Sequence, residues 1–125
     1  MKAGKLHRVP LSRRAISILR DLEKLKQNEF VFPGVKVGKS LSTMSMLQLL
    51  KRMSRTDVTT HGFRSTFRDW AAEKTDYSNE LVEMSLAHAI SNRVEAAYRR
   101  GDMLERRVRL MEDWAEYCAI RAPTV

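Results

Sequence analysis

Three short motifs in this sequence of 125 residues carry side chains able to bind or attack a phosphate group. The first is His61-Gly62-Phe63-Arg64, which stands where a helix is predicted to begin. Backbone amides at a helix start, together with an imidazole and a guanidinium, are suited to holding an anion such as phosphate. The tetrapeptide pattern is also common by chance, so a capping histidine beside a solvated arginine is the ordinary alternative.

The other two motifs each offer one reactive side chain. Leu86-Ala87-His88 places a histidine at the end of a helical pattern, where the helix dipole favours a cation even without a catalytic role. Residues 96–100 include Tyr98, whose hydroxyl is a potential nucleophile. Val94, Ala97 and Tyr98 share one helix face, which is equally typical of a tyrosine in a hydrophobic core.

Six segments with helical spacing of apolar residues are predicted to position these motifs. Ser12, then Thr59 or Thr60, and finally Asp102 with Glu105 are candidate caps for the first, third and last of them. The predicted helices cover residues 12–27, 42 or 43 to 53, 61–74, 79–88, 92–100 and 103–119.

Two segments do not follow the helical pattern. Residues 28–40 contain Pro33, Gly34 and Gly38, which predict a loop or a short strand around residues 30–32. Residues 1–10 alternate around a glycine turn signal and resemble the turn and second half of a β-hairpin. We therefore expect a single, mainly α domain with a small β-hairpin remnant (α+β) whose first strands lie upstream.

Two predicted helices carry a distinct apolar stripe. In the helix at 61–74 the expected buried residues are Phe63, Phe67, Trp70 and Ala71, and His61, Arg64 and Arg68 lie on another face. In the last helix the expected seam consists of Leu104, Val108, Met111, Ala115 and Cys118. This seam is predicted either to close the protein's own core or to dock on a neighbouring protomer.

The charge of the chain points to an acidic partner. Lys and Arg number 23 against 15 Asp and Glu, a net charge of +8 with a pI near 10.1. Residues 1–55 hold 13 basic and 3 acidic side chains, so the excess lies in the first half. A polyanion such as DNA or RNA is the expected partner, with candidate contacts at Lys5, Arg8, Lys39, Lys51 and Arg52. Lys51 and Arg52 are alternatively solvated cations that interact favourably with the dipole at a helix C-terminus.

Composition excludes several other classes. No apolar run approaches the roughly 20 residues of a membrane span, and no secretory signal is present. Cys118 is the single cysteine and the histidines number three, so neither an internal disulfide nor a zinc site is expected. These features predict a cytoplasmic protein without cofactor or metal.

The order and spacing of the three motifs resemble the catalytic half of the tyrosine recombinases, the family of phage and genomic-island integrases. His88 follows Arg64 by 24 residues and Tyr98 follows His88 by ten. The amino-acid sequence is similar to that of integrases that insert beside tRNA genes in four blocks, residues 61–71, 86–88, 97–102 and 111–115. The segments His7-Arg8-Val9-Pro10-Leu11-Ser12 and Phe32-Pro33-Gly34 also resemble this group, so the similarity covers essentially the whole chain.

The resemblance implies the fold of DNA breaking-rejoining enzymes and a role for each matched residue. Tyr98 is the nucleophile, Arg64 and His61 are the second arginine and its partner histidine, and His88 is the later histidine. Lys2, in Lys2-x-Gly4, matches the hairpin lysine. The first arginine of the family lies upstream of the hairpin and has no counterpart here, which implies that the isolated segment is not competent for recombination.

The implied function is site-specific recombination, the integration or excision of a prophage or genomic island through a 3′-phosphotyrosine intermediate. Its partners are a double-stranded attachment site and other subunits in a tetrameric synapse, in a protein encoded by a bacterium or phage. Tyr98, His61, Arg64 and His88 are expected to converge on one phosphate-sized basic pocket. Two alternatives stay open: a DNA-binding helical module or decayed integrase fragment without activity, and a helical RNA-binding protein supported by charge alone.

Overall fold

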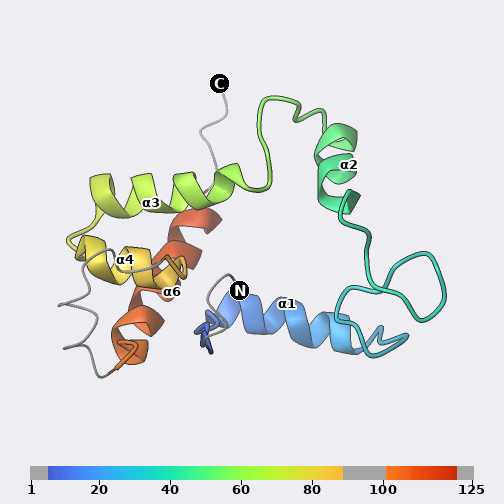
Figure 1. Ribbon diagram of the computed structural model, residues 1–125, viewed down its shortest axis with the longest axis horizontal. Coiled ribbons are helices and arrows are strands. Elements are labelled where there is room, and N and C mark those ends of the chain that lie inside the picture. The colour runs from blue at the N-terminus through green and yellow to red at the C-terminus, as the bar shows by residue number, and fades with distance from the viewer. Residues whose placement is uncertain (1–5, 89–100, 121–125) are drawn as a thin grey trace. The chain divides into compact units, whose positions relative to one another are not determined.

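The computed structural model describes residues 6–88 and 101–120, which contain five α-helices and no sheet (Figure 1). The helices are α1 (Arg13–Glu23), α2 (Ser45–Arg52), α3 (Gly62–Lys74), α4 (Asn79–Ser85) and α6 (Leu104–Ala119). The chain divides into two compact units, one formed by residues 14–66 and the other by residues 1–13 and 67–125. The mainly α class is confirmed by these elements.

The predicted hairpin is not seen. Residues 6–10 contain no strand, and residues 1–5 lie outside the described part of the chain. The backbone carbonyl of Arg8 accepts a hydrogen bond from the side chain of Arg107 instead of from a neighbouring strand. Backbone groups of an extended segment need partners of some kind. Here a buried arginine supplies one.

In the unit of residues 14–66, neither α1 nor α2 has a fully buried residue, and Leu50 is the half-buried member among the apolar residues of α2. Ala15, Ile16, Leu19 and Leu22 are half-buried, as the predicted stripe requires, but the helix ends at Glu23 and leaves Leu25 exposed. Between these helices the chain is a loop with an isolated antiparallel bridge between Pro33 and Ser40. The apolar residues 30–32 therefore belong to a loop.

The second unit has a hydrophobic core made by three helices. Phe67, Trp70 and Ala71 of α3, Leu81 and Val82 of α4, and Leu110 of α6 are its buried members. Trp114 of α6 makes an edge-to-face contact with Phe67, with ring centroids 5.3 Å apart, and lies 5.1 Å from the Trp70 ring. Aromatic pairs in such arrangements contribute beyond the area they bury.

The predicted stripe of α3 is confirmed at three positions and wrong at the fourth. Phe67, Trp70 and Ala71 are buried, whereas Phe63 is 51% exposed. Phe63 lies in the first turn of the helix, ahead of the segment that meets the core of α4 and α6. Helical periodicity gives the face of a residue but does not say how far along the helix its packing partner extends.

The seam predicted for α6 is confirmed at Met111, which packs against the core, and wrong at Val108 and Cys118. The buried residues of the helix are Arg107 and Leu110, with Met111 and Trp114 packed against the core. Val108 is 46% exposed, and Cys118 is also exposed. The buried face of α6 includes the charged residue Arg107, so the apolar residues taken alone predict the neighbouring face.

Candidate active site

His61 and Arg64 lie at the start of α3, as the sequence predicts. The Thr59 hydroxyl accepts a hydrogen bond from the Gly62 amide at 3.0 Å, which confirms Thr59 as a capping residue. A Cβ atom at Gly62 would meet that same hydroxyl oxygen at 3.0 Å, so glycine leaves room for the cap. The Arg64 amide donates to the His61 carbonyl at 3.1 Å. This turn places an exposed imidazole and a half-buried guanidinium one helical turn apart.

His88 follows α4, which ends at Ser85 rather than at residue 88. Ala87 has a left-handed backbone with φ of 57°. Its amide donates to the Met84 carbonyl at 3.1 Å, and the His88 amide donates to the Glu83 carbonyl at 2.9 Å. These two bonds form a Schellman motif, which usually has glycine at the left-handed position. The motif turns the chain so that His88 is directed back along α4.

The turn brings His88 into contact with Glu83, an acidic residue that the sequence motifs did not include. Glu83 Oε2 is hydrogen-bonded to His88 Nδ1, and Glu83 Oε1 lies 2.9 Å from Nε of Arg68 on α3. Glu83 precedes His88 by five residues, a spacing that does not share a face of a continuous helix. The sequence predicted a helix through residue 88 and carried no signal for this contact, because the helix ends at Ser85 and the left-handed position is an alanine rather than a glycine.

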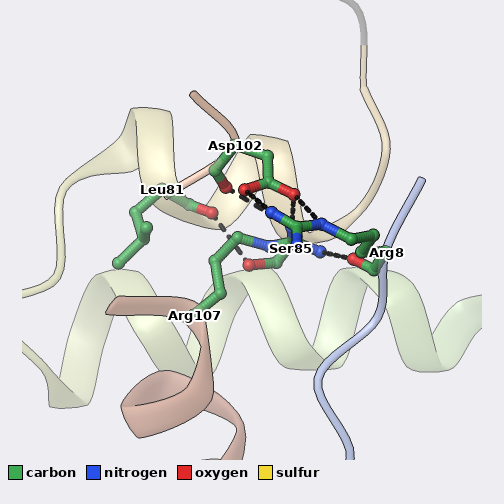
Figure 2. Close-up of polar contacts among 5 residues, drawn as sticks. All are labelled: Arg8, Leu81, Ser85, Asp102 and Arg107. Atoms are coloured by element: carbon green, nitrogen blue, oxygen red, sulfur yellow. Dashed lines mark hydrogen bonds and ion pairs between the residues drawn. The ribbon is translucent and has the colours of Figure 1, made fainter. Parts of the chain in front are cut away.

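The prediction that Asp102 caps α6 is wrong. The first residue before that helix is Met103, which is left-handed with φ of 52° and makes no side-chain capping bond. Asp102 instead accepts two bonds from Arg8, at 2.8 and 2.7 Å, and its backbone carbonyl accepts a bond from Arg107 (Figure 2). An ion pair with two hydrogen bonds replaces the single bond that a cap would make.

The pKa values of Arg8 and Asp102 are shifted by their ion pair, and that of Arg107 is shifted by its burial. Hydrogen bonds from Arg8 lower the pKa of the Asp102 carboxyl, and the same contact raises the pKa of Arg8. Burial lowers the pKa of Arg107, whose side chain is only 1% exposed. Figure 2 draws these three residues together with Leu81 and Ser85 of α4. The Ser85 hydroxyl donates a hydrogen bond to the Leu81 carbonyl at 2.9 Å.

The remaining predicted site residues differ in what the structure says of them. Tyr98, Lys2 and Lys5 lie outside the described residues. Lys39, Lys51 and Arg52 are exposed, with the last two in the final turn of α2, and Arg8 is held by Asp102.

His61 and Arg64 belong to one compact unit and His88 to the other. The convergence of these side chains with Tyr98 therefore stays a prediction.

Among residues 6–88 and 101–120, no group of three His, Cys, Asp or Glu side chains is arranged to hold a metal ion. None of the described helices is both long enough and apolar enough to cross a membrane. Several described carboxylates are instead joined to a cation or a tyrosine, among them those of Glu83, Asp102, Asp57 and Asp113.

Comparison with known proteins identifies relatives over nearly the whole chain. The prophage integrase IntZ of Escherichia coli K12 is 36% identical over 118 residues, which make up 93% of this chain and 29% of that protein. The integrase of Enterobacteria phage P4 is 34% identical over 123 residues, or 94% of this chain and 28% of the phage protein. The prophage integrase IntA of Escherichia coli K12 is 34% identical over 119 residues.

No family model and no solved structure matches the chain. The chain spans less than one third of the length of the integrases it matches. Matched residues extend over 93–94% of the chain, so the similarity includes all three motifs rather than one local pattern. By this similarity the chain belongs to the family of phage and prophage integrases.

Proposed function

We propose that this chain is the catalytic segment of a tyrosine-type integrase, which cuts and rejoins double-stranded DNA through a covalent phosphotyrosine. The observation that carries the proposal is the ordered set His61, Arg64, His88 and Tyr98 in a chain related to integrases over 93% of its length. The substrate is an attachment site of a prophage or genomic island, and the working complex is a tetrameric synapse. The protein acts in the bacterial cytoplasm.

The proposed reaction begins when the Tyr98 oxygen forms a bond to the DNA phosphorus. The bond from phosphorus to the 5′ oxygen breaks, and the tyrosine proton passes to a nearby base, for which His61 and His88 are the candidates. The leaving 5′ oxygen takes a proton from a general acid, for which Lys2 is the candidate. Attack by a 5′ hydroxyl on the phosphotyrosine reverses these steps and restores the backbone.

Arg64 suits the charge that develops during this reaction. The attacked phosphate gains negative charge in the transition state, and fixed cationic donors stabilise that charge electrostatically. A guanidinium bonds two phosphate oxygens at once, which a lysine does not. The position of Arg64 in the first turn of α3 also adds the favourable end of the helix dipole.

The spacing along α3 supports a link between the two histidine motifs. Residues four apart on a helix share a face, so Arg68 follows Arg64 on the same side. Arg68 is the residue that contacts Glu83, which in turn binds His88.

A covalent trapping experiment tests the proposal. The matched segment of the Escherichia coli integrase IntZ is replaced by this chain, and the fusion is incubated with a nicked suicide duplex carrying that integrase's attachment half-site. The fusion is expected to form a protein–DNA adduct that Tyr98→Phe abolishes. Tyr117→Phe is the matched control, because Tyr117 is a partly exposed tyrosine whose ring packs on Trp70 and Trp114.

The second candidate function, a module that binds DNA without cutting it, predicts a different result. The exposed cations Lys39, Lys51 and Arg52 favour binding in either case. A fusion that retards the duplex but forms no adduct supports the binding module. An adduct that survives Tyr98→Phe moves the nucleophile to another residue and contradicts the proposed mechanism.

A further inference from the structure

The side chain of Glu83 lies between a histidine and an arginine from two other segments. One carboxylate oxygen is hydrogen-bonded to Nδ1 of His88, and the other lies 2.9 Å from Nε of Arg68. The Glu83 side chain is 22% exposed, and its Oε1 atom is shielded from solvent. Oε1 meets Arg68 as an ion pair without a hydrogen bond, so the hydrogen bond that orients this carboxylate is the one to His88.

The backbone of Glu83 contributes to the same arrangement. Its carbonyl accepts the His88 amide at 2.9 Å, so Glu83 holds His88 through the main chain and through the side chain. The left-handed residue Ala87 makes this double contact possible. His88 is therefore restrained at its backbone amide and at Nδ1 of its ring, while 40% of its side chain stays exposed.

We propose that Glu83 is a positioning residue that sets the tautomer and orientation of His88. This inference rests on the proposed function, in which His88 acts on the DNA phosphate or on the tyrosine. A carboxylate on Nδ1 favours the tautomer that carries its proton on Nδ1, because only that form donates to the oxygen. The Nε2 atom then presents its lone pair to the site. Carboxylates orient histidines in this way in other catalytic sites.

Arg68 completes the arrangement by holding the carboxylate from the other side. Its Nε atom meets Glu83 Oε1, the oxygen that His88 does not use. Its position on α3 ties the carboxylate to the helix that begins at the His61–Arg64 motif. Arg68 and Glu83 therefore act through His88 rather than on the substrate.

The tautomer of His88 tests this inference directly in the 125-residue chain. Long-range proton–nitrogen correlation spectra resolve the two ring nitrogens of each histidine, and the chain has three histidines. Spectra are recorded at a pH where the imidazoles are neutral. In the wild-type chain most of the His88 population is expected to carry the proton on Nδ1. In Glu83→Gln the Nε2-protonated form, which exposed histidines favour, becomes the majority.

Glu73→Gln is the matched control, because it removes an exposed carboxylate from α3 of the same unit. It is expected to leave the His88 signals unchanged, and neither variant is expected to change those of His61. The amide signals of α6 report whether each variant is folded.

A wild-type chain whose His88 is mainly protonated on Nε2 overturns the inference, whether or not Glu83→Gln folds. An unchanged tautomer in folded Glu83→Gln does the same. Neither result depends on DNA cleavage, so loss of the proposed function in the trapping experiment is a separate outcome.

Discussion

Arg8 and Asp102 are separated by 94 positions in the sequence and form an ion pair with two hydrogen bonds, at 2.8 and 2.7 Å. Asp102 also faces Arg107, whose guanidinium is almost completely buried and donates to the Arg8 carbonyl. One carboxylate thus neutralises an exposed and a buried cation. The pair joins the N-terminal segment to the residues directly before α6.

Asp102→Asn is expected to destabilise the fold more than Arg107→Met does. The first change leaves the buried Arg107 charge without its counter-ion, whereas the second removes the buried charge itself. Urea denaturation measures both, and Asp102→Asn in the Arg107→Met background should cost less than in the wild type. Equal costs in the two backgrounds would contradict the coupling.

The pH dependence of this ion pair follows from the lowered pKa of Asp102. The contribution of the ion pair to the free energy of unfolding is fully present above the ordinary aspartate pKa. It is lost as the pH falls through the lower pKa of the folded state. The wild type is therefore expected to lose its advantage over Asp102→Asn on acidification.

Tyr77→Phe is expected to cost about 1–2 kcal/mol at neutral pH, because the Tyr77 hydroxyl donates to the Asp113 carboxylate. Burial, followed by that carboxylate, raises the pKa of Tyr77 to about 12. A raised tyrosine pKa stabilises the fold below the ordinary value of about 10 and loses this effect as the pH rises through 12. Denaturation midpoints at pH 8 to 12 should therefore converge for the two proteins, and a constant difference would argue against it.

Ala87→Gly is expected to stabilise the chain by about 1 kcal/mol. Ala87 has φ of 57°, a conformation that costs a residue with a Cβ atom roughly 1–2 kcal/mol. Ala72→Gly, at an exposed position inside α3, is the matched control and should destabilise by about 1 kcal/mol. Thermal unfolding compares the two. A loss of stability at both positions would show that Ala87 is not strained.

Met111→Asp is expected to destabilise the second unit by about 3 kcal/mol or more, since Met111 packs against the core and a charge there loses its hydration. Val108→Asp, on the same helix but 46% exposed, should change stability by less than about 0.5 kcal/mol. Docking of α6 on a neighbouring protomer is then best tested with Val108→Asp. Synapsis that survives this change would leave the exposed face without a role in assembly.

Changing both Lys51 and Arg52 to Gln should weaken DNA binding and lower its dependence on salt concentration. Each lost phosphate contact reduces the slope of log affinity against log salt by about 0.9. Arg55→Gln is the control, because Arg55 is engaged by Asp57 through two bonds of 2.8 Å and the pair has no net charge. Fluorescence anisotropy from 50 to 200 mM salt measures the slopes. An equal effect of Arg55→Gln would indicate general electrostatics rather than contacts on α2.

The sequence by itself determined the mainly α class, the approximate position of all five described helices and the three buried residues of α3, to which it wrongly added Phe63. These follow from local patterns, since capping residues and a 3.6-residue period act within one helix. The three motifs also identified the integrase family, because their residue types, order and spacing are read from the sequence without any knowledge of packing. Helix ends were less accurate, as at Glu23 and Ser85, where the chain leaves the helix before its apolar pattern ends.

Only the tertiary structure decided what Glu83, Asp102 and Arg107 do. Glu83 meets His88 because a left-handed residue reverses the chain, and no periodicity announces that turn. Arg107 occupies a core position because the nearby Asp102 carboxylate balances its charge and the Arg8 carbonyl, 99 positions away, accepts a hydrogen bond from it. A buried charge is stable only with such partners, and partners separated by more than 90 positions come together only in the folded chain.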